Sequence, residues 1–319
     1  MQNALNLSEL RAAFRSGSLP KSEYIKKASM IHDQLYDFSE VLKECDVNEI
    51  RIRAGEVEFI VGELNLRIFC PRGESRYAPL EILNFGSYES FESKILDSLC
   101  LEVNSIFDIG ANVGWYALNF AALNPTCVIY AFEPLPTAHA YLKINVTMNN
   151  FQNQIQIEKI ALSDTLGKQE FVQPVMNSTN SSFVNVANSE DVIIHEVETC
   201  TIDQYISNNN CSVDLVKCDV EGAEFQVFLG AEQSLRRFKP VIFTEILRKW
   251  SGAFGNHPND LIQFLKTIGY SCFEVSDGYL VEICKVSEET TATNFLFLTD
   301  SEAHKSILNT FKLKGWIQN

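Results

Sequence analysis

Seven short apolar runs recur along the second and larger part of the chain, separated by segments with the spacing of amphipathic helices. This alternation predicts a mainly parallel sheet with helices packed on both of its faces. The expected strands span residues 105–109, 127–132, 155–160, 213–218, 240–245, 271–275 and 294–298. The pattern therefore predicts a seven-stranded α/β domain over residues 79–319, without internal repeats.

Residues 1–78 follow a different pattern and are expected to form an extension of helices and a β-hairpin. Ser18-Leu19-Pro20 is typical of a helix start. Apolar residues spaced by threes and fours follow on one face of that helix: Tyr24, Ala28, Ile31, Leu35 and Phe38. The stripe favours packing against the chain's own core, with a docking or dimerisation helix of a homo-oligomer as the alternative. Residues 57–61 and 64–69 alternate around Gly62-Glu63 as the two strands of a β-hairpin do.

The composition is that of an ordered globular protein. Its 319 residues are 46% hydrophobic and 21% charged, which is ordinary for a chain with a large core. The formal net charge of −15 argues against a nucleic-acid or anionic-membrane partner, because binding phosphates requires clustered Lys and Arg. No apolar run reaches the length of a membrane span, and the N-terminus lacks the order of a secretory signal.

The nine cysteines are odd in number and scattered, and they contain no C-x-x-C pair. Cys127 and Cys218 lie within apolar runs, where a free thiol packs as a small hydrophobic group. This usage predicts buried, reduced cysteines and a cytoplasmic protein. It also argues against a zinc site, since the five histidines are too dispersed to complete one.

The turn after the first expected strand indicates a ligand site. Gly110 and Gly114 follow Asp108 and precede a helical pattern. Two glycines four apart permit a tight turn and a close approach of the backbone to a ligand. A dinucleotide fingerprint would need further glycines where Asn112 and Trp115 stand. The turn therefore favours an adenosine ligand without phosphates over a nicotinamide dinucleotide.

Acidic residues follow two further strands. Glu133 comes directly after the second strand, where such folds bind a ribose diol, because one carboxylate can accept hydrogen bonds from both hydroxyls. The fourth strand leads into three carboxylates around a glycine: Asp219, Glu221, Gly222 and Glu224.

Together these segments resemble the FkbM-type S-adenosylmethionine-dependent methyltransferases, in family order from about residue 100 to 250. The blocks are Phe107-Asp108-Ile109-Gly110-Ala111-Asn112-Val113-Gly114, Ala131-Phe132-Glu133-Pro134, Asn145-Val146 with Asn149, Ala161-Leu162-Ser163-Asp164, Thr201-Ile202-Asp203, Lys217-Cys218-Asp219-Val220-Glu221-Gly222-Ala223-Glu224 and Pro240-Val241-Ile242-Phe243-Thr244-Glu245. Cys218 departs from the aliphatic residue usual in the family, and residues 1 to about 80 match none of its blocks. The resemblance implies a Rossmann-like class I methyltransferase fold with S-adenosylmethionine as the cofactor.

The resemblance also implies roles for single residues. The methyl donor is expected to be bound by Asp108, Gly110, Asn112, Gly114 and Glu133. Methyl transfer is an in-line displacement, and a hydroxyl acceptor must lose its proton during attack. Asp219, at the tip of the fourth strand, is the first candidate for the base or for orienting the acceptor. Glu221 and Glu245 are further catalytic candidates, although the helix macrodipole alone favours acids at Glu221 and, more so, at Glu224.

Other polar residues near these tips have two interpretations each. Asp219 and Glu245 could hold magnesium or calcium, but a metal-free site is preferred and no metal ligand is assigned. Lys217, in mid-strand, either pairs with one of the acids or extends past the strand end. His257 is either a base or a surface residue. Tyr88-Glu89 either borders the donor site or starts a helix.

The polar segment 173–197 is either a surface excursion or a loop or lid beside the acceptor. As a whole, the sequence predicts an O-methyltransferase whose acceptor is a small molecule or glycan, with the hydroxyl on a sugar, glycan or natural-product scaffold. The oxygen acceptor and the sugar preference come from the resemblance alone. Two alternatives are a non-catalytic protein that binds an adenosyl ligand and a nicotinamide-dependent oxidoreductase.

Overall fold

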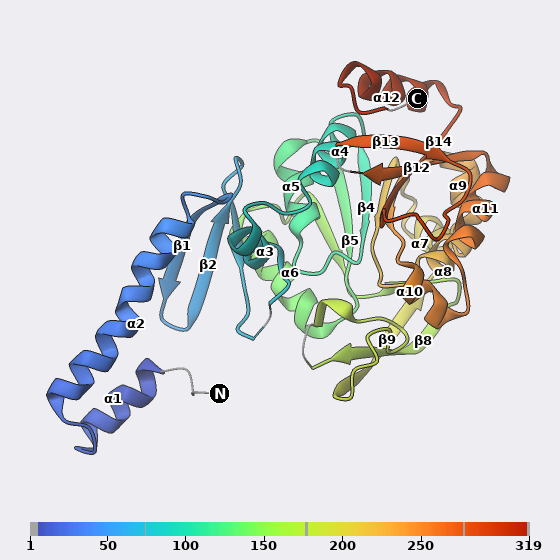
Figure 1. The fold of residues 1–319 in the computed structure, drawn as a ribbon. Coiled ribbons are helices and arrows are strands. Elements are labelled where there is room, and N and C mark those ends of the chain that lie inside the picture. Colours follow the sequence, from blue (N-terminus) through green and yellow to red (C-terminus); the bar gives the residue numbers. More distant parts are fainter. Residues whose placement is uncertain (1–5, 74, 176–177, 277, 318–319) are drawn as a thin grey trace.

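An eight-stranded sheet forms the centre of the larger part of the molecule in the computed structural model, which describes residues 6–73, 75–175, 178–276 and 278–317 (Figure 1). The strand order is β13-β12-β14-β11-β10-β4-β5-β6. These strands are β4 (Ser105–Ile109), β5 (Val128–Phe132), β6 (Ile155–Glu158), β10 (Leu215–Cys218), β11 (Val241–Glu245), β12 (Tyr270–Ser276), β13 (Tyr279–Ile283) and β14 (Asn294–Thr299).

Five neighbouring strands, from β6 to β11, are parallel, and β14 runs antiparallel to both β11 and β12. All seven predicted strands are confirmed, but the sheet has an eighth, β13, which the sequence analysis missed. This edge strand buries only Leu280, so its hydrophobic pattern is weak. The carboxyl ends of the parallel strands meet at one edge of the sheet, and this edge positions the candidate site.

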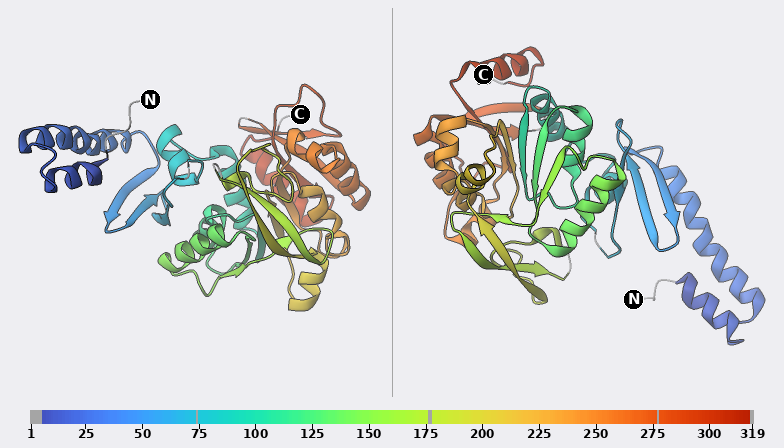
Figure 2. Two further views of the ribbon diagram at one scale, coloured as in Figure 1. Left: turned by 90° about the horizontal axis from the view of Figure 1, so that it is seen from below. Right: turned by 180° about the vertical axis from the view of Figure 1, so that it is seen from behind.

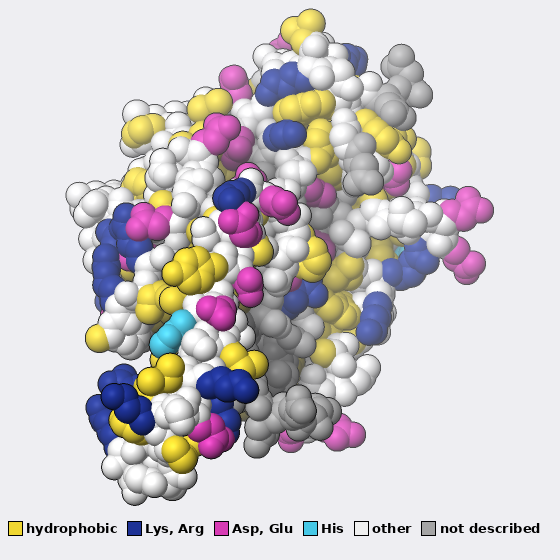
Figure 3. Space-filling view, turned by 60° about the vertical axis from the view of Figure 1, so that its left-hand side comes forward, with side chains coloured by type: hydrophobic (Ala, Val, Ile, Leu, Met, Phe, Trp, Pro, Cys, Tyr) yellow, Lys and Arg dark blue, Asp and Glu magenta, His cyan; other side chains and the backbone are white. Residues whose placement is uncertain are grey.

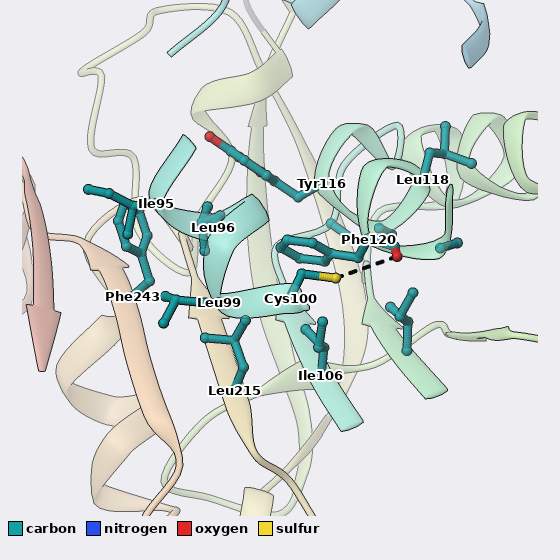
Figure 4. Close-up of a cluster of buried hydrophobic side chains, with 14 of the residues drawn as sticks. Ile95, Leu96, Leu99, Cys100, Ile106, Tyr116, Leu118, Phe120, Leu215 and Phe243 are labelled. Carbon is teal, nitrogen blue, oxygen red and sulfur yellow. Dashed lines mark hydrogen bonds between the residues drawn. The ribbon is translucent and has the colours of Figure 1, made fainter. Parts of the chain in front are cut away.

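Helices cover both faces of the sheet, as predicted. One face packs against α4 (Ser90–Cys100), α5 (Trp115–Leu123), α6 (Pro136–Met148) and α12 (Glu302–Leu313). The other packs against α7 (Ile202–Asn209), α8 (Glu224–Leu229), α9 (Glu232–Phe238) and α11 (Pro258–Ile268). Because side chains alternate along a strand, Ile106 faces the first group and Phe107 the second. In the first layer, the Cys100 thiol donates to the Phe120 carbonyl oxygen at 3.5 Å (Figure 4).

The N-terminal part forms an arm and a small sheet beside this body (Figures 1 and 2). Its elements are α1 (Leu7–Arg15), α2 (Lys21–Val41), β1 (Val47–Arg53), β2 (Glu56–Val61) and β3 (Leu66–Phe69). The predicted hairpin is confirmed as β2 and β3, but β1 pairs with β2 and makes a three-stranded antiparallel sheet. Residues 1–5 of the expected extension lie outside the described residues.

The connection from this small sheet to the body contains α3 (Ala78–Phe85), and the loop after β11 contains α10 (Arg248–Ser251) and the 3-10 turn η2 (Gly252–Phe254). A third sheet has the order β7-β9-β8, from β7 (Ala161–Leu162), β8 (Gly167–Pro174) and β9 (Val192–Cys200), with η1 (Ser178–Asn180) between the last two. The segment 173–197, of which 176–177 are not described, thus includes the end of β8 and the start of β9. None of the described helices has the length and apolarity needed to cross a membrane.

Candidate active site

A pocket of about 480 Å³ opens at the carboxyl ends of β4, β5, β10 and β11. Its walls come from the turns that follow these four strands and from segments further away in the chain, which include residues 76–78, 87–89 and 160–162, Phe171, and residues 179–181 with Phe183. This is the place where open α/β sheets bind their ligands. The last of these segments belongs to the polar stretch 173–197, so part of that stretch borders the pocket.

The glycine turn after β4 is fixed by protein contacts on both sides. The N–H groups of Gly110 and Ala111 donate to the carbonyl oxygen of Phe132, at 3.1 and 3.0 Å. Gly110 and Gly114 have φ of 77° and 94°. A Cβ at Gly110 would overlap the Asp219 carbonyl oxygen, and one at Gly114 would lie 2.6 Å from a Leu142 methyl carbon. The two glycines therefore permit close packing against other parts of the chain. Of the two, Gly110 lines the pocket and Gly114 does not.

Glu133 lies in the pocket wall with both carboxylate oxygens held by the backbone. Its Oε2 accepts from the Asn112 N–H and its Oε1 from the Leu135 N–H, each at 2.9 Å. Burial raises the pKa of Glu133 to about 7, although these two hydrogen bonds act in the opposite direction. Asn112, with φ of 50°, presents a buried side-chain oxygen that has no hydrogen-bond partner among the described residues.

Lys217 lines the pocket and lies between two of the candidate acids. Its Nζ lies 3.8 Å from Asp108 Oδ1, 3.5 Å from Asp219 Oδ2 and 5.2 Å from the centre of the Tyr116 ring. Burial alone would lower the pKa of Lys217, but the carboxylates of Asp219, Asp108 and Glu89 outweigh it and raise the pKa. Pairing therefore explains this lysine in mid-strand. Asp108 is 1% exposed and does not line the pocket, so its contact with a donor stays a prediction.

The structure brings Asp219, Glu221 and Glu245 together in the pocket wall, as the sequence predicts for neighbouring strand tips. Burial raises the pKa of Glu221, and the charges of Asp219 and Glu245 raise it further. Burial likewise raises the pKa of Glu245, with contributions from Asp219 and Glu89. The raised pKa values of Glu221 and Glu245 favour their protonated forms, in which a carboxyl group can donate a hydrogen bond to a ligand.

Two other candidates have structural roles. Glu224 is buried, and its Oε1 accepts from the N–H groups of Val220 and Gly222 at 3.2 and 3.0 Å, so it holds the turn that presents Glu221. His257 caps α11, where its Nδ1 accepts from the Asn259 N–H at 3.1 Å. Neither lines the pocket.

Apart from Tyr88, the aromatic residues of the pocket were not assigned a role by the sequence analysis. Tyr88, Trp115, Phe183 and Trp250 line it, and the rings of Tyr88 and Trp115 meet edge to face at 5.6 Å. Trp115 Nε1 has no hydrogen-bond partner among the described residues. The sequence held one indication of this role, because Trp115 replaces the third glycine of a dinucleotide fingerprint and so lies in the turn predicted to bind a ligand.

Glu89 is a further acid of the pocket, for which the sequence left two interpretations open. It lines the pocket, and it is also the residue preceding α4, so the helix start is confirmed, whereas a place beside the donor stays a prediction. The Tyr116 hydroxyl donates to its Oε2, and burial raises the pKa of Glu89. Glu89 and Glu221 have φ of 43° and 56°, a conformation that is strained for glutamate and often found at functional sites. Across the described ranges, no group of three or more His, Cys, Asp and Glu side chains could hold a metal ion.

A known protein family matches part of the chain. The model of the methyltransferase FkbM domain matches residues 108–272, just over half of the chain. The match begins at Asp108 and ends in β12, so it covers the turns of β4, β5, β10 and β11 that form the pocket.

Individual relatives of known function are 22–28% identical to the chain. The chain is 24% identical over 225 residues to the AMB antimetabolite synthetase AmbE of Pseudomonas aeruginosa, covering 54% of this chain and 10% of that protein. It is 28% identical to the 2-O-methyltransferase NoeI of Sinorhizobium fredii, covering 44% and 62%. It is 22% identical to the 31-O-demethyl-FK506 methyltransferase FkbM of Streptomyces tacrolimicus, covering 59% and 81%. The chain thus spans less than two thirds of the first two proteins.

Solved structures that match the chain include a methyltransferase FkbM from Methylobacillus flagellatus, at 16% identity and a TM-score of 0.40, covering 61% of this chain and 44% of that one. A SAM-dependent O-methyltransferase from Thermotoga maritima has 13% identity and a TM-score of 0.38, covering 70% and 71%.

Proposed function

Since the chain belongs to the FkbM methyltransferase family, we propose that this methyltransferase takes its methyl group from S-adenosylmethionine and delivers it to a hydroxyl of a sugar, glycan or natural-product scaffold. The observation that carries the proposal is the single pocket shared by the turn after β4, Glu133 and the three acids Asp219, Glu221 and Glu245. One pocket thus offers groups suited to a nucleoside and groups suited to a hydroxyl.

The residues of the pocket fit the donor. When bound, S-adenosylmethionine supplies an electrophilic methyl group on a positively charged sulfur. Glu133 would hold the ribose hydroxyls, and the unpartnered Asn112 oxygen and Trp115 N–H offer further polar contacts. Among the described lining residues the two cations, Arg76 and Lys217, both pair with carboxylates. The pocket therefore suits an adenosyl ligand without phosphates better than a dinucleotide.

The acid cluster supports a hydroxyl acceptor. A hydroxyl must lose its proton as it attacks, and a positioned carboxylate can accept that proton. Asp219 is the acid of the three that forms an ion pair, with Lys217, and its side chain is 32% exposed, so an acceptor can reach it. Glu221 and Glu245, with raised pKa values, would donate hydrogen bonds to acceptor oxygens and exclude bulk water from the site.

The relatives support an oxygen acceptor through their names. One is a 2-O-methyltransferase and another a 31-O-demethyl-FK506 methyltransferase, so relatives of this chain act on different oxygen acceptors. The choice of a sugar or related scaffold rests on the resemblance of the whole motif series to the family. The site's carboxylates and aromatic rings are compatible with it, because rings pack on apolar sugar faces while carboxylates accept from hydroxyls.

Titration calorimetry with S-adenosylhomocysteine, with and without magnesium and EDTA, tests the donor half of the proposal. One-to-one binding is the expected result, and no binding in any condition would contradict the donor assignment. Transfer of a labelled methyl group from S-adenosylmethionine to fractions of a cell extract tests the acceptor half. Label recovered as an alkali-stable methyl ether supports an oxygen acceptor. Binding without any transfer would favour the non-catalytic alternative.

A further inference from the structure

The second half of α2 is an amphipathic helix that no described segment covers. In the first half, α1 packs against the apolar face, where the Phe14 and Tyr24 rings stack at 4.9 Å and Ala28 is 3% exposed. Beyond Ile31, every residue from 32 to 41 is exposed. Leu35 and Phe38 continue the face of Tyr24 and Ala28 by helical spacing, and they are 55% and 45% exposed.

Exposed apolar side chains concentrate on this arm and the sheet beside it. Of the 20 large hydrophobic residues that are exposed in the described chain, ten lie between Phe14 and Leu64. Single exposed hydrophobics are normal on a monomer, but a gathering of this kind indicates an interaction surface. The arm projects away from the body (Figures 1 and 2), and Figure 3 shows hydrophobic side chains among charged ones over its surface. A partner can therefore approach without meeting the rest of the molecule.

The charges of the arm divide between its two ends. Residues 7–27 contain five basic and two acidic side chains, a formal charge of +3, in the order Glu9, Arg11, Arg15, Lys21, Glu23, Lys26 and Lys27. Residues 28–41 contain three acidic side chains and no Lys or Arg, a formal charge of −3: Asp33, Asp37 and Glu40. At the basic end α1 covers the apolar face of α2, whereas at the acidic end this face is exposed.

We propose that two copies of this chain associate through the α1–α2 arm, side by side and antiparallel about a two-fold axis. In this arrangement the basic, covered end of each arm lies against the acidic, bare end of the other. The stretch Ile31, Leu35 and Phe38 of each copy is then buried against the partner's helical hairpin. A two-fold interface uses the same patch of both copies, so the patch must be complementary to itself. The arm meets this requirement because its two ends have opposite charges and because α1 covers the apolar face at only one of them. Two helical hairpins joined in this way form a four-helix arrangement.

Sedimentation velocity at micromolar concentrations tests the association directly, whatever the methyltransferase acts on. The wild-type chain of 36.0 kDa is expected to be a dimer. The double variant L35E/F38E should be monomeric, because it places carboxylates on the bare acidic face. The control L313E changes a side chain that is 90% exposed on α12, and it should remain dimeric. Unchanged binding of S-adenosylhomocysteine by all three would show that the body is folded.

A charge-swap experiment tests the antiparallel order. The variant D33K/D37K has two basic ends and K26E/K27E has two acidic ends, so each should dimerise at least tenfold more weakly than the wild type. An equimolar mixture of the two should recover the dimer, because every basic end again meets an acidic end. A monomeric wild type up to about 100 μM would overturn the proposal. So would a dimer that survives L35E/F38E, or charge variants that fail to recover on mixing.

Discussion

Asn145 on α6 donates a hydrogen bond from Nδ2 to the carbonyl oxygen of Val113, 2.9 Å away in the turn after β4. Its Oδ1 accepts from the N–H of Phe69 in β3 at 2.7 Å, and the side chain is fully buried. One amide thus joins the N-terminal sheet, a helix of the body and the turn expected to bind the donor. Asn149, one helical turn later, forms two hydrogen bonds with the backbone of Arg67 but none with that turn.

Replacing Asn145 by leucine should weaken both the fold and donor binding. Two buried backbone groups would lose their partners, which costs about 1–3 kcal/mol each in free energy of unfolding. Because Val113 belongs to the turn predicted to bind the donor, the Kd of S-adenosylhomocysteine should rise severalfold in calorimetry. The matched variant Asn149→Leu also loses backbone contacts to β3, but its donor affinity should stay at the wild-type value. Equal losses of affinity in both variants would mean that general loosening, and not the contact with Val113, is responsible.

Donor affinity should depend on pH through Glu133. An ionised carboxylate accepts from both ribose hydroxyls, and the pKa of this group is raised to about 7 by burial. Affinity for S-adenosylhomocysteine should therefore increase from pH 6 to pH 8, by up to about tenfold for each pH unit below the pKa. In Glu133→Gln the affinity should be low and nearly independent of pH over this range.

Glu224 provides the control for that experiment. Burial raises its pKa to about 7 as well, but it holds the backbone of the turn after β10 and does not line the pocket. The variant Glu224→Gln should retain the pH dependence of the wild type. If Glu133→Gln retained it too, another group would have to be responsible, and the ribose assignment would lose its support.

Replacing Asp219 by asparagine should separate binding from turnover. The variant keeps a side chain of the same shape beside Lys217 but cannot accept the acceptor's proton, so turnover should fall by about 10²–10⁴-fold. The Kd of S-adenosylhomocysteine should change little, because the residues predicted to bind the donor lie at the ends of β4 and β5. Glu302→Gln, at an exposed acid on α12, controls for loss of a negative charge. Full turnover by Asp219→Asn would remove this residue from the base role.

The positions of the main strands were predictable because both faces of a parallel sheet are buried. Ile106 and Phe107 face opposite helical layers, so the strand is apolar throughout and is easily detected. The strands that were missed are β1, β7, β8, β9 and β13. β7 has only two residues, and the other four are partly exposed, so their patterns merge with those of polar loops. The meeting of Asp219, Glu221 and Glu245 was predictable as well, since the tips of parallel strands share one edge.

Other features of the site depend on contacts between distant parts of the chain. The sequence suggested that Gly110 and Gly114 leave space for a ligand, whereas the space beside them is filled by the Asp219 backbone and the Leu142 side chain. Glu89 reaches the pocket because α3 and α4 fold over the turn, and its left-handed backbone has no signature in the sequence. Such long-range packing has no local pattern from which to predict it.

The clustered acids should make the fold less stable at alkaline pH. Burial and neighbouring carboxylates raise the pKa of Glu245 above its ordinary value of 4.5. A group whose pKa is raised in the folded state contributes stability that is fully present below its unfolded pKa and is lost as the pH rises toward the folded pKa. The free energy of unfolding should therefore fall from pH 5 to pH 8, by up to about 1.4 kcal/mol per pH unit for each such group.

Glu245→Gln removes one of these groups, so it should be more stable than the wild type at pH 8, with a smaller difference at pH 5. Urea unfolding at pH 5, 6.5 and 8 measures both chains, and Glu302→Gln should follow the wild type at every pH because its side chain is 91% exposed. Glu221 lies in the same cluster with a pKa raised in the same direction, so Glu221→Gln should show the same trend. A Glu245→Gln advantage that grew toward acid pH would contradict the assignment, because it would require a carboxyl that is stabilised in its ionised form.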